Sequence, residues 1–451
     1  FGEATKLAIS QTASRAVNRT NFLDQPIIVA QDVSGNRVEN YSSSVSIAVT
    51  RAGTTVPFQL TGTGSMNAVS GVASFTGLGL IGEAGDFTLT YSSGSLTTTS
   101  QTIRLTHGAA FSIEVTGPAE ANSGADLSAP VVVKVFDQDK NLVTTGTESV
   151  ALSVPVTISG QTTRSVEAGI ATFTNLRFTS TTGIKRVTAT LFRDSSITAF
   201  YDIDLKAGLA TQFELVAAPT TSVNREAFGT QPVIRALDAT GNLANSFTGD
   251  VSIAVTRIGG GSAAVISGTA LRTAVAGEVS FSSLGLVGQV GNYTLTYSSS
   301  TAGIATTSHT VSLTHGVANQ LSLVSGVTSS LSRQQFGADS VIQVLDASGN
   351  AVTNFTGEIS VAVGGSNITL TGSTTRQLTA TSQRNFADLE LFGKIGTYTL
   401  TFSSGSLTPV TQNVELVHGV AHSLDLQMGL TAKNNQTISA VVCLLYTSPS
   451  P

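Results

Sequence analysis

The sequence predicts an all-β chain built from tandem antiparallel β-sandwiches. A short motif led by aspartate recurs at intervals near one hundred residues, which is the size of one small domain. Short runs alternate apolar and polar residues, which is the period of a strand. No stretch sustains the period of a helix. We therefore expect one sandwich of about seven strands in each repeat, with the repeats arranged as an elongated rod.

The recurring motif has the form Asp-x-x-Gly-Asn, and its leading residues are Asp32, Asp137, Asp238 and Asp346, separated by 105, 101 and 108 residues. An aspartate opens a turn by accepting hydrogen bonds from the backbone, and glycine or asparagine then takes a positive φ. Each copy lies between two extended runs, so each is predicted to be a β-hairpin connection. In the second copy Lys140 replaces the turn glycine.

Apolar residues alternate with mostly polar ones on both sides of each motif, as in Ile28 and Ala30 before the first copy and Val45, Ile47 and Val49 after it. This pattern is typical of half-buried antiparallel strands. Later in each repeat a strand is anchored by a phenylalanine, with a leucine three residues further on. These pairs are Phe75 and Leu78, Phe173 and Leu176, Phe281 and Leu284, and Phe386 and Leu389.

A glycine break then leads to what the pattern predicts as the last regular strand of each repeat. Its alternating residues are Phe87, Leu89 and Tyr91; Val187, Ala189 and Leu191; Tyr293, Leu295 and Tyr297; and Tyr398, Leu400 and Phe402.

Short joints of the type Leu-Thr-His-Gly separate the repeats. The predicted ranges are 1–107 (repeat 1), 108–207 (repeat 2, the most divergent), 208–315 (repeat 3), 316–418 (repeat 4) and 419–442 (the truncated start of a fifth repeat). No Pro/Gly/Ser-rich linker lies between them, which favours stiff joints over flexible ones.

The last nine residues, 443–451, depart abruptly from the repeat pattern. They resemble a translated sequencing-library adapter; the alternative is a genuine Pro-rich linker. On the adapter interpretation the natural segment ends near Val442 and contains no cysteine, so Cys443 is neither a disulfide partner nor a nucleophile. This tail is then expected to pack on nothing.

Composition narrows the classes of partner. Only 11% of the 451 residues are charged, against roughly 25% in ordinary globular chains. A formal charge of −5 gives no basic patch, so nucleic acid is not an expected partner. No apolar run approaches the ~20 residues needed to span a bilayer. The chain starts at Phe1 without a signal peptide, so we interpret it as an interior fragment.

Three patterns could mark sites, and each has a structural interpretation. The run 77–82 fits Gly-x-Gly-x-x-Gly, but a strand rather than a helix follows, which favours a turn over dinucleotide binding. His107, His315 and His418 lie at joints, where capping or packing is favoured and a pH-sensitive joint is the alternative. The turn aspartates are expected to cap their own turns. Calcium is the alternative, best supported in repeat 2, where Asp137 and Asp139 lie together.

Taken in order, these motifs resemble a known family. Gln25-Pro26, the Asp-x-x-Gly-Asn turn, the run from Gly71 to Leu78 and the run from Gly291 to Thr296 are similar to the tandem bacterial Ig-like repeats of large surface and secreted proteins, of the invasin and intimin type. The resemblance covers residues 1–442. It implies Ig-like sandwiches that commonly serve as stalks for a separate adhesive or catalytic module, and it implies no catalytic residues.

We therefore expect a non-enzymatic stalk of a bacterial cell-surface or secreted adhesin-like protein, with no catalytic, cofactor-binding or metal-binding residues and no cofactor. Contact with a host or neighbouring cell would be made by modules outside the fragment, and the rod is expected to be monomeric. Two alternatives stay open: an accessory spacer or carbohydrate-binding region of a large secreted enzyme, marked by an exposed aromatic platform, and phage Ig-like decoration domains.

Overall fold

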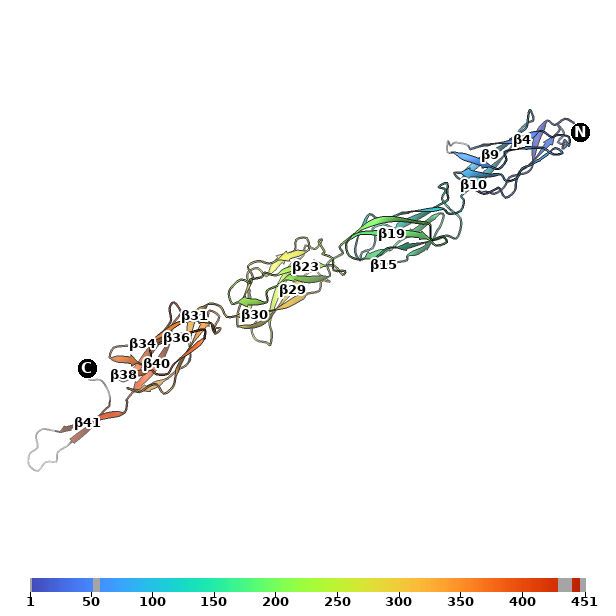
Figure 1. Cartoon of the computed structure of the whole chain (residues 1–451). Coiled ribbons are helices and arrows are strands. Elements are labelled where there is room, and N and C mark those ends of the chain that lie inside the picture. Colours follow the sequence, from blue (N-terminus) through green and yellow to red (C-terminus); the bar gives the residue numbers. More distant parts are fainter. Residues whose placement is uncertain (1, 52–56, 429–439, 447–451) are drawn as a thin grey trace, which may run out of the picture. The chain divides into compact units, whose positions relative to one another are not determined.

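The structure is a computed structural model that describes residues 2–51, 57–428 and 440–446. Strands are the only regular elements in these ranges, as the sequence predicts (Figure 1). No helix that could cross a membrane occurs among the described residues. The chain divides into two compact units, one of residues 1–208 with 239–242 and one of residues 209–238 with 243–451.

Repeat 1 contains two facing sheets and a small third one. Strand order is β1-β3-β7 in the first sheet, β2-β10-β9-β4-β6 in the second and β5-β8 in the third. The strands are β1 (Lys6–Gln11), β2 (Ala16–Val17), β3 (Ile27–Gln31), β4 (Ser44–Thr50), β5 (Phe58–Thr61), β6 (Ser65–Asn67), β7 (Val72–Ser74), β8 (Gly79–Gly82), β9 (Gly85–Ser92) and β10 (Thr99–Thr106). The chain crosses between two sheets that are antiparallel except for the parallel pair of β2 and β10, which is the arrangement of an Ig-like sandwich.

The same sheet order returns in repeats 2, 3 and 4. Repeat 2 contains β11 (Ser112–Thr116), β12 (Glu120–Asn122), β13 (Val131–Phe136), β14 (Ser149–Ser153), β15 (Thr157–Ser159), β16 (Thr163–Ser165), β17 (Ile170–Phe173), β18 (Arg177–Thr179), β19 (Gly183–Leu191) and β20 (Thr198–Lys206). Repeat 3 contains β21 (Gln212–Ala217), β22 (Thr221–Val223), β23 (Val233–Leu237), β24 (Asp250–Arg257), β25 (Val265–Ser267), β26 (Leu271–Thr273), β27 (Glu278–Ser280), β28 (Gly285–Val287), β29 (Gly291–Ser299) and β30 (Thr307–Thr314). Repeat 4 contains β31 (Ala318–Ser325), β32 (Ser329–Leu331), β33 (Ser340–Asp346), β34 (Gly357–Gly364), β35 (Ile368–Thr371), β36 (Thr375–Leu378), β37 (Gln383–Phe386), β38 (Glu390–Gly393), β39 (Gly396–Ser403) and β40 (Val410–Val417). The chain is therefore all-β, with tandem Ig-like sandwiches.

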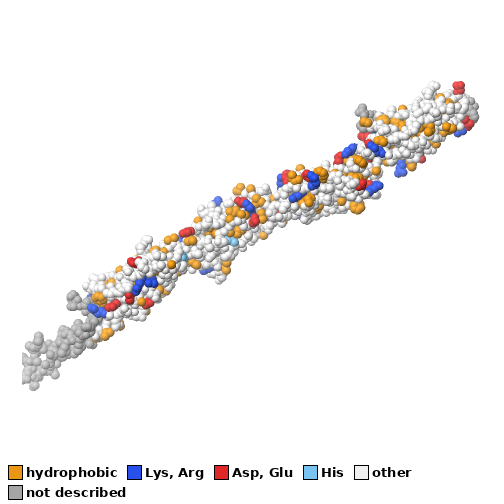
Figure 2. Space-filling model, viewed as in Figure 1, with side chains coloured by type: hydrophobic (Ala, Val, Ile, Leu, Met, Phe, Trp, Pro, Cys, Tyr) orange, Lys and Arg blue, Asp and Glu red, His pale blue; other side chains and the backbone are white. Residues whose placement is uncertain are grey.

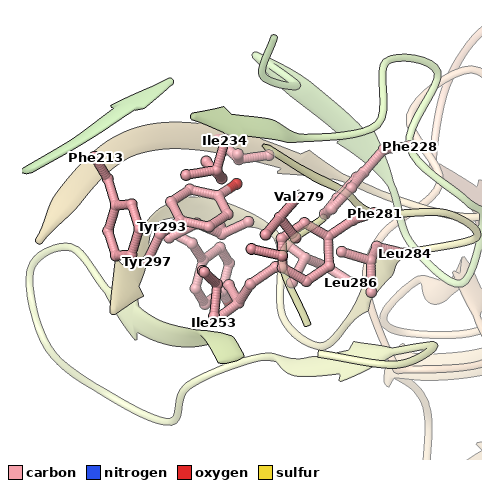
Figure 3. Packing of buried hydrophobic residues seen from close by; sticks show 14 of the residues in the cluster. Phe213, Phe228, Ile234, Ile253, Val279, Phe281, Leu284, Leu286, Tyr293 and Tyr297 are labelled. Atoms are coloured by element: carbon pink, nitrogen blue, oxygen red, sulfur yellow. The ribbon is translucent and has the colours of Figure 1, made fainter. Parts of the chain in front are cut away.

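The hydrophobic core of each repeat follows the predicted apolar phase. The phenylalanine and leucine pairs are buried in all four repeats. In repeat 3, Phe281 and Leu284 lie between the two sheets with Tyr297, whose ring centroid is 6.2 Å from that of Phe281 (Figure 3). These cores are stabilised by interdigitated apolar side chains. The described residues contain no disulfide that could add to this.

The prediction of a β-hairpin at each aspartate motif is wrong. Strand β3, before the first motif, pairs with β1 and β7, whereas β4, after it, belongs to the opposite sheet. Only a single bridge, Gln31 to Arg37, closes the turn itself. A turn motif specifies about four residues of backbone, and the pairing of the flanking strands is decided by the sandwich.

The predicted last strand of each repeat is not the last. Strands β10, β20, β30 and β40 follow it and pair with it in antiparallel fashion. The described part of each repeat holds ten strands rather than about seven. The additional ones include strands of two to four residues, too short to show a period of alternation. Within the glycine run 77–82, Gly79–Gly82 is strand β8 rather than a turn, and no helix follows it.

The C-terminal segment forms a pair of strands, β41 (Ala421–Met428) and β42 (Ala440–Tyr446). Cys443 pairs with Asp425 in this ladder, so the expectation that the tail packs on nothing is wrong for residues 443–446. Backbone pairing accepts almost any extended sequence, so the adapter interpretation stays a prediction. Residues 447–451 lie outside the described residues.

Candidate functional site: the joints between repeats

The aspartate motif of repeat 2 does two things at once. Oδ1 of Asp137 accepts hydrogen bonds from the backbone NH groups of Asp139 and Asn141, at 3.0 and 2.8 Å, which caps the turn as predicted. Lys140 supplies the positive φ of 66° that glycine supplies in the other copies. The second oxygen, Oδ2, faces the preceding repeat and is left to bind it.

Oδ2 of Asp137 is bound from the joint and from repeat 1. The backbone NH of Gly108 donates to it at 2.7 Å, and the side-chain amide of Asn18 donates at 2.8 Å. Oδ1 of Asn18 in turn accepts the backbone NH of Gly82 at 3.0 Å. Asn18 and Asp137 are 2% and 1% exposed. A buried carboxylate with several donors is held in one place, because moving it would leave those groups without partners.

Asn141, the last residue of the motif, makes a second connection to repeat 1. Its side-chain NH2 donates to the carbonyl of Gly82 at 3.0 Å, and its Oδ1 accepts the backbone NH of Ala84 at 2.6 Å. On the outer side, Arg19 forms a bidentate ion pair with Asp139, at 2.7 and 2.9 Å. The motif is therefore a clasp between two domains as well as a turn.

The joint between repeats 3 and 4 repeats this network with equivalent residues. The amide of Asn224 and the backbone NH of Gly316 both donate to Oδ2 of Asp346 at 2.8 Å. Asn350 donates to the carbonyl of Gly288 at 2.9 Å and accepts the backbone NH of Val290 at 2.8 Å. Here no ion pair is added: Arg225 donates to the hydroxyl of Ser348 at 3.1 Å.

The electrostatics of the two clasps are alike. Burial by itself would raise the pKa of Asp137, but hydrogen bonds from Gly108, Asn141 and Asn18 outweigh it and hold the pKa below its ordinary value. For Asp346 the corresponding donors, Gly316 among them, lower the pKa in the same way against the effect of burial. Both carboxylates are therefore ionised over the whole neutral range.

Two of the joint histidines cap the joint, as the sequence predicts. Nδ1 of His107 lies 2.9 Å from the carbonyl of Gly108, and its Nε2 accepts the backbone NH of Thr145 at 3.1 Å. The acceptor role of Nε2 places the proton on Nδ1. His315 contacts the carbonyl of Gly316 at 3.0 Å and the hydroxyl of Thr353 at 3.2 Å.

The calcium alternative requires several oxygen ligands, but the carboxylates of Asp137 and Asp139 face N–H donors. Asp137 and Asp139 share the amide of Asn18, at 2.8 and 2.7 Å, and Asp139 is also paired with Arg19. Across the described residues, no group of three or more His, Cys, Asp and Glu side chains is placed to hold a metal ion.

Exposed aromatic residues, the feature that would mark a carbohydrate-binding face, occur on repeat 2: Phe111, Phe192 and Phe200 are 57%, 76% and 56% exposed. Of these, Phe200 of β20 has a partner over its ring. The guanidinium of Arg186 lies over its ring, 3.8 Å from the centroid, and is held there by Asp202. The ring of Phe200 is thus covered by a cross-strand cation–π contact.

Sequence reasoning found the aspartates of these clasps and missed their partners. Asn18 and Asn224 carry a detectable signal, because each stands in the sequence Val-Asn-Arg at the same place in its repeat. The equivalent positions of repeats 2 and 4 hold Ser123 and Ser332. No local pattern connects an asparagine with an aspartate 119 residues further on.

No family model and no curated protein matches the chain. Among solved structures, the chain is similar to FdeC, an Escherichia coli adhesin, with 14% identity, a TM-score of 0.36, and coverage of 69% of this chain and 98% of that one. It is also similar to invasin, a bacterial integrin-binding protein, with 12% identity, a TM-score of 0.32, and coverage of 94% of this chain and 82% of that one. A third similar structure is that of the surface layer protein SbsC, domains 4–9, with 15% identity, a TM-score of 0.22, and coverage of 97% of this chain and 72% of that one. The likeness is one of fold alone.

Proposed function

We propose that residues 1–442 are a non-enzymatic stalk of a bacterial cell-surface or secreted adhesin-like protein, which holds a separate functional module away from the cell. The proposed building blocks are the four repeats with boundaries after His107, Ala207, His315 and His418, followed by the start of a fifth. Its place is extracellular or on the cell surface, and contact with host or neighbouring cells belongs to other modules.

The observation that carries this proposal is the repetition of one buried clasp at two joints. Asn18 with Asp137, and Asn224 with Asp346, are joined by the same atoms at the same distance of 2.8 Å. A ligand site needs polar groups that converge on an accessible pocket. These groups converge on each other and are buried, which serves to hold one domain against the next.

The position of the clasp within a repeat also suits a spacer. In repeat 1, β1 and β2 both run parallel to β10, with Lys6 beside Thr97 and Val17 beside Thr106. Asp32 follows the strand residue paired with Lys6, and Asn18 follows Val17. Asn18 and Asp32, the equivalent of Asp137, therefore lie at opposite ends of the strands of repeat 1, which leaves each end free to join a different neighbour.

The experiment replaces residues 1–207 in the parent protein with two unrelated β-sandwich domains of similar size. A stalk tolerates this exchange, so adhesion or surface display of the distal module should be retained. Deleting the same residues without replacement should reduce adhesion or display, because the distal module is then held closer to the cell. If the unrelated domains fail to restore function while the native ones succeed, the repeats act by more than their length.

The alternatives differ in what flanks the segment. A membrane or cell-wall anchor with an adhesive module supports the stalk of a surface protein. A catalytic module supports a spacer in a secreted enzyme, and a virion structural protein supports a phage decoration domain. Sequencing the open reading frame on both sides separates the three.

A further inference from the structure

A cleft of about 820 Å³ opens where repeat 1 meets repeat 2. Its charged walls are Arg15, Arg104 and Glu83 from repeat 1 and Lys140 from repeat 2, with His107 from the joint and Thr144 beside them. Figure 2 shows basic and acidic side chains gathered where these two repeats meet. The clasp residues Gly108 and Asn141 also line this cleft, but the clasp uses none of the side chains of Arg15, Arg104 and Lys140.

Arg15 and Arg104 line the same cleft, Arg104 from strand β10 and Arg15 from the residue that precedes β2. Strands β2 and β10 are parallel, with Ala16 opposite Leu105, and the two arginines each precede one of these residues. Both side chains are exposed. Like charges that line one cleft repel each other. An anion bound between Arg15 and Arg104 would offset this repulsion.

The acidic side chains that the structure describes around this cleft are not paired with either arginine. In the described part of the chain, no ion pair joins Arg15 or Arg104 to an acidic side chain. Asp86 is the cross-strand neighbour of Arg104, yet it lies beyond ion-pair distance. The nearest other acids already have partners: Glu83 with Arg51 and Glu114 with Lys140.

The equivalent joint of the same chain gives an internal comparison. Between repeats 3 and 4, Thr221 lies opposite Ser312 in the positions of Arg15 and Arg104, and Gly349 replaces Lys140. The cleft at that joint, of about 630 Å³, has no Lys, Arg, Asp or Glu in its walls. Because the clasp there is the same, the cations at the first joint are not needed to hold two repeats together.

We propose that the cleft between repeats 1 and 2 is a binding site for an oxyanion group, namely a carboxylate, sulfate or phosphate, either as a free ion or carried on a saccharide. Arginine suits this role because its planar guanidinium donates two parallel hydrogen bonds to such a group. A cleft of 820 Å³ has room for more than one ion, and its threonine hydroxyls can bind the hydroxyl groups of a sugar. This adds a ligand site to a segment otherwise proposed as a stalk.

The test measures binding by isothermal titration calorimetry on the full chain. The probes are sodium sulfate, a sulfated disaccharide and the same disaccharide without sulfate. We expect one site per chain for a sulfated probe, weakened by added salt, and no binding of the unsulfated sugar. Tighter binding of the sulfated disaccharide than of sulfate identifies a saccharide as the source of the oxyanion, and equal binding identifies a free ion.

The variant Arg15→Asn with Arg104→Ser should weaken binding by roughly tenfold or more for each arginine removed. Asparagine is chosen because Arg15 has a φ of 49°, which asparagine tolerates. Arg272→Ser, an exposed arginine on repeat 3, is the matched control and should leave binding unchanged. Thermal unfolding of each variant checks that the repeats remain folded.

A graft tests the same idea as a gain of function. Thr221→Arg with Ser312→Arg should create a second site at the joint between repeats 3 and 4 and raise the stoichiometry from one to two. The proposal is overturned if neither sulfated probe binds the native chain, or if the Arg15 and Arg104 variant binds as tightly as the native protein.

Discussion

The side-chain amide of Asn18 donates a 2.8 Å hydrogen bond to Oδ2 of Asp137, across 119 residues of sequence and from one repeat to the next. Both groups are buried. The same bond joins Asn224 to Asp346 in the other unit. A surface turn motif is thereby also the contact that fixes one sandwich against its neighbour.

Removing the amide should open one joint and leave the other closed. Asn18→Ala removes one of the donors to Oδ2 of Asp137 and leaves the buried Gly82 NH without its acceptor, at a cost of about 1–3 kcal/mol for that NH group. Hydrogen exchange measured by mass spectrometry on the full chain should show faster exchange at Gly108 and Ala84. The equivalent amides of the second joint, Gly316 and Val290, are the internal control. Unchanged exchange at Gly108 would show that Asn18 does not hold the joint.

The clasps should be insensitive to pH until strongly acid conditions. The pKa values of Asp137 and Asp346 are held below their ordinary value of 3.8 by the donors around them. A carboxyl group whose pKa is lower in the folded state stabilises that state above the unfolded pKa, and this stabilisation is lost as the pH falls through the folded pKa. The amide NMR signals of Asn141 and Asn350, whose backbone NH groups donate to Oδ1 of the two aspartates, should therefore stay constant from pH 7 to about 4 and shift only below that.

Asp137→Asn separates this effect from general acid unfolding. The acid-induced shift should disappear at Asn141 and persist at Asn350, because only the first joint has lost its titrating aspartate. If both signals still shift together, acid acts on the whole fold rather than on the clasp.

A glycine at the second joint is required for close approach. A Cβ on Gly316 would lie 2.6 Å from the carbonyl oxygen of Asn224, so Gly316→Ala should force the joint apart at a cost of about 1–3 kcal/mol. Gly229→Ala is the control, because nothing lies within 4 Å of its added Cβ and its φ is not positive. Exchange of the Asn350-bound Val290 amide reports on the joint. Equal behaviour of the two variants would contradict the close contact.

Each repeat should unfold independently of the others when its core is disrupted. Phe281 is 3% exposed at the centre of repeat 3, so Phe281→Ala should destabilise that repeat by about 3–5 kcal/mol. Phe200→Ala, on the exposed face of repeat 2, should cost less than about 1 kcal/mol. Differential scanning calorimetry of the full chain should show one transition moved by Phe281→Ala. A shift of every transition together would mean that the repeats unfold as one.

The sequence by itself determined the strand period, the positions of the cores and the capped turns. Alternation places Phe281 and its three equivalents inside because a strand exposes successive side chains to opposite faces. The Asp-x-x-Gly-Asn motif caps its own turn because its donors and acceptor lie within four residues of one another. Both are local properties, so a single sequence carries them.

Only the tertiary structure decided which strands pair and what the turn contacts. Strands β3 and β4 flank one turn but belong to opposite sheets, because the sandwich, not the turn, selects their neighbours. Oδ2 of Asp137 finds Asn18 only after two separate domains have folded and met. Likewise, Arg15 and Arg104 are 89 positions apart in the chain and become neighbours through the parallel pairing of β2 with β10. Such contacts depend on the packing of distant segments, which no local pattern of residues encodes.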